Sequence, residues 1–111
     1  MAIVDPAMME SLPGGVVAAT GFDVLSHAVE SYTARAFTSR RRPDHPGARP
    51  PYQGATPYND IGAIAAIELG GRYLARAVTD PGDKAARHQL MFAATLAGLA
   101  FGSAGVHVPH A

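Results

Sequence analysis

The sequence lacks cysteine altogether, and its nine basic residues balance its nine acidic ones, so that the formal net charge is zero. The absence of cysteine excludes disulfides, thiolate nucleophiles and zinc–thiolate sites, and it favours a reducing compartment such as the cytoplasm. Any metal ion must therefore be bound through nitrogen and oxygen. A balanced charge gives no long-range attraction to nucleic acid or to an anionic membrane, so neither is expected as a partner.

Long apolar runs and targeting signals are also missing. The most apolar stretch is LMFAATLAGLAF at 90–101. It is about half as long as the roughly 20 residues that cross a bilayer, so it predicts a buried helix. The N-terminal stretch MAIVDPAMMESLPGG has no basic start followed by an apolar run, and two prolines interrupt it. We expect no targeting segment and, at 111 residues, one small domain.

An all-α fold with one short N-terminal strand is expected. Residues 1–4 are apolar and end at Asp5-Pro6, which suits a strand. Residues 7–19 suit a short helical turn. The order Thr20-Gly21-Phe22-Asp23 has the arrangement of a capping box, which predicts that the first long helix begins there. One face of that helix is apolar and consists of Phe22, Leu25, Val29 and Tyr32.

A long loop separates this helix from the next one. Residues 37–57 contain five of the nine prolines, so they form neither a helix nor a central strand. A loop of this length in a compact domain is usually functional or disordered. Its run Arg40-Arg41-Arg42 suggests phosphate binding, with a solvated charge cluster as the alternative.

Two further helices are expected after the loop. Asn59 can cap the first of them, and Asp80-Pro81-Gly82-Asp83 marks the start of the second. The apolar packing stripe of the first consists of Ile61, Ile64, Ile67 and Leu74. The second is apolar on all sides from Leu90 to Phe101 and ends at Gly102–Gly105. The other helices are too few to enclose it, so exposed apolar surface and self-association are expected.

Asp23 and His27 are candidate metal ligands. They lie four positions apart, one helical turn, so their side chains can converge on one ion. A carboxylate with an imidazole suits iron(II), zinc or manganese better than copper(I) or calcium. The alternative is that Asp23 caps the helix with Thr20 and that His27 is an ordinary histidine. The spacing alone leaves both interpretations open.

Three other polar residues can contribute to such a site. His107 and His110 form a second candidate pair at three-residue spacing, with solvated terminal histidines as the alternative. Glu30 lies one turn beyond His27, where it can hydrogen-bond the other imidazole nitrogen or simply face solvent.

Three motifs carry a resemblance over essentially the whole chain. They are TGFDVLSHAVESY from residue 20, the loop ending RPPYQGATPYNDI, and AGLAFGSAGVHVPHA at 97–111. Together they resemble the iron-containing alcohol dehydrogenase family. Its fold joins a nucleotide-binding α/β domain to a C-terminal all-helical domain, with a divalent metal held by one aspartate and three histidines. The resemblance implies that residues 1–111 are a partial metal-binding helical domain and that residues 1–6 are the end of the nucleotide-binding domain.

Carried across by position, the resemblance makes Asp23 and His27 the first two metal ligands and His110 the third. The fourth histidine would lie beyond Ala111. Pro109 and Ala111 differ from the usual residues beside the third ligand. The implied cofactors are a divalent metal, iron(II) ahead of zinc, and NAD(P) in the complete enzyme. Catalytic and cofactor-contacting residues are not identified from the sequence.

The implied activity is hydride transfer between a hydroxy carbon and a nicotinamide. The long loop is similar to that of family members that oxidise a hydroxy acid such as γ-hydroxybutyrate to succinate semialdehyde while reducing an oxo acid such as 2-oxoglutarate. This chain alone is expected to be inactive, since the nucleotide-binding half and the fourth ligand are absent. Eukaryotic relatives add the mitochondrial matrix as an alternative location. A non-catalytic helical metal-binding or interaction module, or a truncated gene product, is the alternative function.

Overall fold

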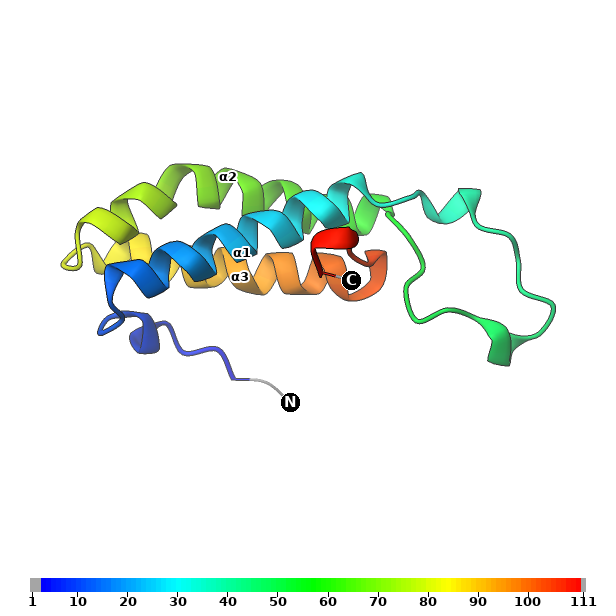
Figure 1. The fold of residues 1–111 in the computed structure, drawn as a ribbon, viewed down its shortest axis with the longest axis horizontal. Coiled ribbons are helices and arrows are strands. Elements are labelled where there is room, and N and C mark those ends of the chain that lie inside the picture. Colours follow the sequence, from blue (N-terminus) through cyan, green and yellow to red (C-terminus); the bar gives the residue numbers. More distant parts are fainter. Residues whose placement is uncertain (1–2, 111) are drawn as a thin grey trace.

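The fold is an elongated bundle of three α-helices. The computed structural model describes residues 3–110, and within them it forms α1 (Gly14–Thr33), α2 (Pro57–Thr79) and α3 (Lys84–Ala104), with four short 3-10 turns and no strand. The helices lie side by side, and a long loop projects from one end of the bundle (Figure 1). The all-α fold expected from the sequence is confirmed over this range. None of these helices is both long enough and apolar enough to cross a membrane.

The strand expected over residues 1–4 is not formed by Ile3 and Val4, and residues 1 and 2 lie outside the described range. A strand needs a neighbour to pair its backbone groups, and among residues 3–110 no strand is available to do so. The chain instead enters a 3-10 turn at Pro6–Met9, where the Asp5 carboxylate accepts a 2.9 Å hydrogen bond from the Ala7 N–H. The short helical turn predicted in this region is present.

The capping box predicted at Thr20 is wrong, because α1 already begins at Gly14, directly after Pro13. The Thr20 hydroxyl donates to the Val16 carbonyl at 2.9 Å inside the helix and caps nothing. Asp23 is therefore not a helix cap. The helix extends toward the N-terminus because Val17 and Gly21 continue its buried face, and packing of such a face supplies most of a helix's stability.

The prediction that Asn59 caps α2 is also wrong. Thr56, not Asn59, caps α2, since the Thr56 oxygen accepts from the Asn59 N–H at 3.2 Å. The Asn59 side chain is buried and donates to the Ala100 carbonyl at 2.9 Å and to the Ser103 hydroxyl at 2.7 Å. It therefore ties the start of α2 to the end of α3. The predicted start of α3 is close to correct, because Asp83 caps the helix by accepting from the Ala86 N–H.

Small residues line the interior of the bundle. The buried positions recur three and four residues apart in each helix, as expected for helices that pack along one stripe. They include Val17, Gly21, Val24 and Ala28 in α1, Ala63, Ala66, Gly70, Leu74 and Ala77 in α2, and Ala86, Leu90, Ala93, Ala97, Ala100 and Ala104 in α3. Leu74 packs where a side chain on Gly21 would lie, and Leu25 does the same at Gly70. These reciprocal contacts bring α1 and α2 close together.

The apolar faces predicted for α1 and α2 are therefore wrong in part. Phe22 and Ile61 are 66% and 72% exposed. Val29, Tyr32 and Ile64 are also exposed, whereas Leu74 is buried. Alanine and glycine occupy the interior because they allow the helix backbones to approach closely, which leaves the larger side chains outside. Phe92 and Leu99 of α3 are exposed as well, so this helix is not enclosed on all sides.

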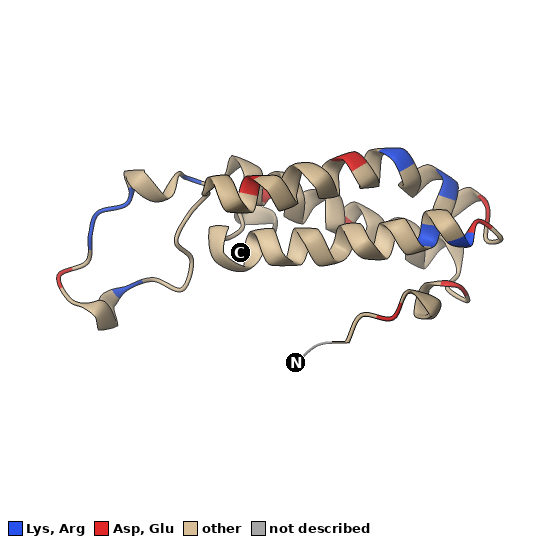
Figure 2. Cartoon of the chain, turned by 180° about the vertical axis from the view of Figure 1, so that it is seen from behind, with Lys and Arg blue, Asp and Glu red and all other residues tan. Residues whose placement is uncertain are grey.

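The long loop is confirmed. It joins α1 to α2 and holds two 3-10 turns, Phe37–Ser39 and Pro46–Ala48. A single parallel bridge between Ala36 and Ala55 closes its base. Basic residues gather on this loop and again at the far end of the bundle (Figure 2). The ion pairs within residues 3–110 do not involve the loop arginines.

Candidate metal centre

Helix α1 presents three polar side chains on one side, Asp23, His27 and Glu30, at positions i, i+4 and i+7. Their environments differ. The Asp23 side chain is 56% exposed, the His27 side chain is 20% exposed, and Glu30 is buried. Of the residues that the structure describes, Glu30 is the one buried acid. A buried carboxylate is costly unless hydrogen bonds compensate it, so its partners indicate its role.

The C-terminal segment folds back onto this side of α1. Gly105 ends α3 with φ of +93°, a conformation that residues with a Cβ rarely adopt, and the chain reverses direction there. A last 3-10 turn, Val108–His110, follows and lies against α1 near the loop end of the bundle (Figure 1). This reversal brings His110 next to Glu30 and Asp23, which lie 80 and 87 positions earlier in the chain.

Glu30 binds this C-terminal segment with both of its oxygens. Oε2 accepts a 2.6 Å hydrogen bond from the backbone N–H of His107, and Oε1 lies 2.7 Å from Nδ1 of His110. The sequence suggested that Glu30 either faces solvent or contacts His27. The first suggestion is wrong because Glu30 is buried, and the hydrogen bond goes to His110 instead.

The Asp23 carboxylate lies between two imidazoles. Its Oδ1 is 3.0 Å from Nε2 of His110, and its Oδ2 is 3.4 Å from Nδ1 of His27. The two imidazole rings stack with centroids 4.0 Å apart, and Phe101 of α3 stacks on His27 at 4.3 Å. One ligand atom from each of Asp23, His27 and His110 lies within 4.8 Å of the others. The structure thus brings together all three residues that the resemblance implies as metal ligands.

The electrostatics of this cluster follow from its hydrogen bonds. The hydrogen bond with Asp23, followed by that with Glu30, raises the pKa of His110 above its ordinary value, although burial acts in the opposite direction. Burial tends to raise the pKa of Glu30, but the hydrogen bonds from His107 and His110 outweigh it and leave that pKa lowered. These hydrogen bonds therefore favour an ionised Glu30 carboxylate beside a protonated His110 imidazole.

The donor set fits a borderline divalent cation. One carboxylate and two imidazoles are ligands that iron(II) and zinc accept. Atoms bound to one ion at about 2 Å lie roughly 3–4 Å apart, so small side-chain rotations suffice to close these three donors around it. A proton on Nε2 of His110 lies toward Asp23, and a cation bound by the same two atoms would replace it. Three donors leave a four-coordinate ion one open position.

His107 does not join this cluster. Its Nε2 lies 3.4 Å from the Thr33 hydroxyl, and only its backbone N–H contacts Glu30. The histidine pair predicted from three-residue spacing therefore separates into one side chain at the cluster and one beside the end of α1. No local sequence pattern predicts the Glu30–His110 contact, since it depends on the reversal at Gly105.

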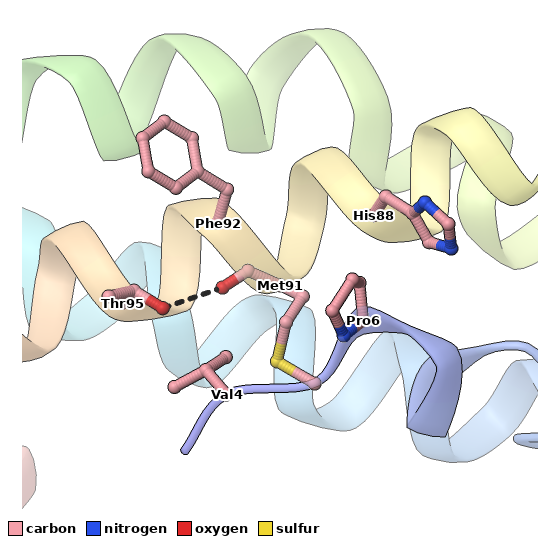
Figure 3. Close-up of a pocket in the computed structure, with 6 residues that line it drawn as sticks. All are labelled: Val4, Pro6, His88, Met91, Phe92 and Thr95. Atoms are coloured by element: carbon pink, nitrogen blue, oxygen red, sulfur yellow. Dashed lines mark hydrogen bonds between the residues drawn. The ribbon is translucent and has the colours of Figure 1, made fainter. Parts of the chain in front are cut away.

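A pocket elsewhere on the molecule is a weaker candidate. Val4, Pro6, His88, Met91, Phe92 and Thr95 line a hollow of about 280 Å³ between the N-terminal segment and α3 (Figure 3). Its lining is mainly apolar, and the ring of His88 contacts Glu10 at 3.1 Å. The Thr95 hydroxyl donates to the Met91 carbonyl within the helix. No cluster of ligand atoms forms there.

Known proteins share both the sequence and the fold. The family model for the C-terminal part of the iron-containing alcohol dehydrogenases matches residues 52–111. A mitochondrial hydroxyacid-oxoacid transhydrogenase of Caenorhabditis elegans is 45% identical over 99% of this chain and 24% of its own length. The chain thus spans about a quarter of that relative.

Solved structures agree. An iron-containing alcohol dehydrogenase from Thermococcus thioreducens matches with a TM-score of 0.74 at 34% identity, over 95% of this chain and 22% of that one. A sulfoacetaldehyde reductase from Bifidobacterium kashiwanohense in complex with NAD+ matches with a TM-score of 0.72 at 31% identity, over 96% of this chain and 23% of that one.

The class of protein follows from these observations: the bundle matches the C-terminal helical domain of iron-containing oxidoreductases. The chain belongs to the iron-containing alcohol dehydrogenase family. Among its relatives, the name hydroxyacid-oxoacid transhydrogenase recurs at about 45% identity. The fold class and the family resemblance read from the sequence are thereby confirmed.

Proposed function

We propose that Asp23, His27 and His110 bind a divalent metal, iron(II) in preference to zinc, in a protein that transfers hydride between a hydroxy acid and NAD(P). The observation that carries the proposal is that the Asp23 carboxylate contacts the imidazole of His110, near the C-terminus, at 3.0 Å and that of His27, in α1, at 3.4 Å. The family name supports iron, and the NAD+ complex of a structural relative supports a nicotinamide.

The metal would supply Lewis acidity to the oxygen of the reacting carbon, which becomes a carbonyl or an alkoxide. The chain's own residues would hold that site in place. His27 is held between neighbours by ring stacking on Phe101 and His110. Asp23 contributes the negative charge that favours a cation over a neutral ligand. Residues 1–6 would mark the end of the nucleotide-binding domain, and the loop at 37–57 would be part of the helical one.

The proposed substrates are a hydroxy acid such as γ-hydroxybutyrate and an oxo acid such as 2-oxoglutarate. The names of the relatives, hydroxyacid-oxoacid transhydrogenases, support this pair. The cytoplasm is the location we propose, and the mitochondrion, where those relatives are named to reside, is the alternative. Because the chain spans 24% of such a relative, we expect the 111 residues alone to bind metal without turnover.

Calorimetric titration with zinc, and with iron(II) under anaerobic conditions, tests the metal site. The wild-type chain should bind one ion, and His27→Ala should lose that binding. His45→Ala is the matched control, because His45 lies in the exposed loop. An absence of binding by the wild type, or equal binding by His27→Ala, would contradict the proposal. NAD-dependent oxidation of γ-hydroxybutyrate by the 111-residue chain would contradict its expected inactivity.

Self-association is the second part of the proposal about partners. Phe22, Ile61 and Leu99 are each more than 60% exposed, and each lies on a different helix. Contiguous patches of exposed apolar side chains mark surfaces that another protein covers, and such a patch is what we propose for this bundle. Light scattering over a range of concentrations tests this expectation, since a monomer at every concentration would contradict it.

A further inference from the structure

We propose that Glu30 is a positioning residue for His110: it holds the ring so that Nε2 faces Asp23 and His27. This inference rests on the proposed metal site. It concerns a residue outside the convergent ligand set of Asp23, His27 and His110, since the oxygens of Glu30 contact the His107 N–H and the Nδ1 of His110.

The first argument is burial. Glu30 is 6% exposed, and its nearest charged neighbour is the imidazole of His110. An acid is rarely retained in such a place without bonds that require it. Both of its oxygens are used, at 2.6 Å and 2.7 Å, by two donors of one short segment. The carboxylate therefore fixes the backbone at His107 and the ring at His110 together.

The second argument is the tautomer of His110. An ionised carboxylate only accepts hydrogen bonds, so the Nδ1 of His110 that contacts Glu30 must carry a proton. The Nε2 proton points toward Asp23 at 3.0 Å, so it is the proton that a cation would displace, and the lone pair that binds the cation would then be on Nε2. A carboxylate that holds the far nitrogen of a metal-binding histidine in this way orients the ring and raises its basicity.

The third argument is how little else holds the C-terminal segment. His107, Val108 and Pro109 are exposed, so apolar burial contributes little there. The other side-chain contact of His107 is a long one, 3.4 Å to a Thr33 hydroxyl that already donates to the Val29 carbonyl. Without the Glu30 carboxylate, His110 keeps only its contact with Asp23 and its stacking on His27, while its Nδ1 and the backbone N–H of His107 lose their acceptor.

Glu30→Gln is the informative variant, because it keeps the size of the side chain. A glutamine has one carbonyl oxygen and one amide nitrogen, so it cannot accept from both His107 and His110. Glu68→Gln is the matched control, since it removes the same charge from an exposed position on α2.

Zinc titration by calorimetry is the first measurement. We expect Glu30→Gln to bind zinc about 10- to 100-fold more weakly than the wild type, the usual range for a lost partner of a metal-binding histidine. Glu68→Gln should match the wild type. Equal zinc affinity of Glu30→Gln and wild type would overturn the positioning role, whereas a wild type that binds no zinc would overturn the metal site itself.

The ring nitrogens of His110 give a second measurement that needs no variant. Long-range 1H–15N spectra of the wild type with zinc bound should show the remaining ring proton on Nδ1, the atom that contacts Glu30. A zinc-bound ring that carries its proton on Nε2 would overturn the proposal. In Glu30→Gln the population should shift toward the Nε2–H form, a change that a merely structural role does not produce. Should this variant not fold, the wild-type spectrum still decides.

Discussion

The two ends of the bundle use charged side chains in different ways. At the turn between α2 and α3, Arg76 pairs with Asp83 at 2.7 Å, and Lys84 pairs with Glu10 at 2.6 Å. Toward the loop end, Asp23 and the two imidazoles direct their ligand atoms at one another within 4.8 Å. At the first end these two pairs neutralise charge within the chain itself. At the second end the donor atoms converge on one point.

Arg87 is a buried charge near the α2–α3 turn end of the bundle. It is fully buried in α3, and its Nη1 donates to the backbone carbonyls of Met9, Glu10 and Leu12 at 2.8, 3.1 and 2.8 Å. Its bonds tie the N-terminal segment to the bundle without any ligand. The comparison teaches that the ion pairs and the Nη1 bonds of Arg87 stabilise the scaffold, with Nε and Nη2 of Arg87 left buried without a partner among residues 3–110. The convergent lone pairs at the other end instead suit an added cation.

Replacing Arg87 should lower the free energy of unfolding more than any other change considered for the α2–α3 turn end of the bundle. Arg87→Met leaves three carbonyls without their donor, and unpaired buried polar groups cost roughly 1–3 kcal/mol each. We expect a loss of about 3 kcal/mol in the free energy of unfolding by urea, with unchanged zinc affinity. Arg72→Met, an exposed change on α2, is the control. A loss no greater than that of the control would show that Arg87 is not the anchor.

Added zinc should stabilise the fold only by binding at the loop end of the bundle, where Asp23 and the two imidazoles converge. Zinc at 100 times its dissociation constant should raise the free energy of unfolding by about 2.7 kcal/mol in the wild type and in Arg72→Met. In Asp23→Ala the gain should disappear, because the carboxylate that contacts both imidazoles is gone. Thermal unfolding with and without zinc measures it. A similar gain in Asp23→Ala would place the ion elsewhere.

Two glycines near the end of α3 should respond to alanine with opposite changes in stability. Gly105 has φ of +93°, and a Cβ there would lie 3.0 Å from Cβ of Tyr52. Gly105→Ala should therefore cost about 1–2 kcal/mol of stability and weaken zinc binding through His110. Gly102 is helical with open space around it, so Gly102→Ala should gain up to about 1 kcal/mol. Urea unfolding compares them, and equal signs would contradict the role of the turn.

The smallest expected effect is the acid sensitivity of the first end. The Ala86 N–H, and after it Arg76, lower the pKa of Asp83. A lowered pKa means that the ionised group stabilises the fold above its unfolded pKa of about 3.9, and that this contribution is lost as the pH falls through the folded value. The urea midpoint should fall between pH 5 and pH 3, and less steeply for Asp83→Asn. Identical slopes would refute this assignment.

Several features of the fold were predictable from local sequence. Proline density identifies the loop, Asp83 lies in the predicted start of α3, and Gly105 lies at its predicted end. The predicted faces failed for Phe22 and Ile61, which are exposed. Helical periodicity shows that a face is apolar but not whether large or small residues will form the contact. Close approach of three helices favoured the alanine and glycine faces.

The candidate site divides in the same way. Four-residue spacing in a helix places Asp23 and His27 on one turn of α1, so the local sequence suffices to predict that they lie together. The contacts of His110 with Asp23 and with Glu30 arise only when the helices pack. Those contacts span 87 and 80 positions, and they depend on the packing of α3 against α1 and on the reversal at Gly105, which no local pattern encodes.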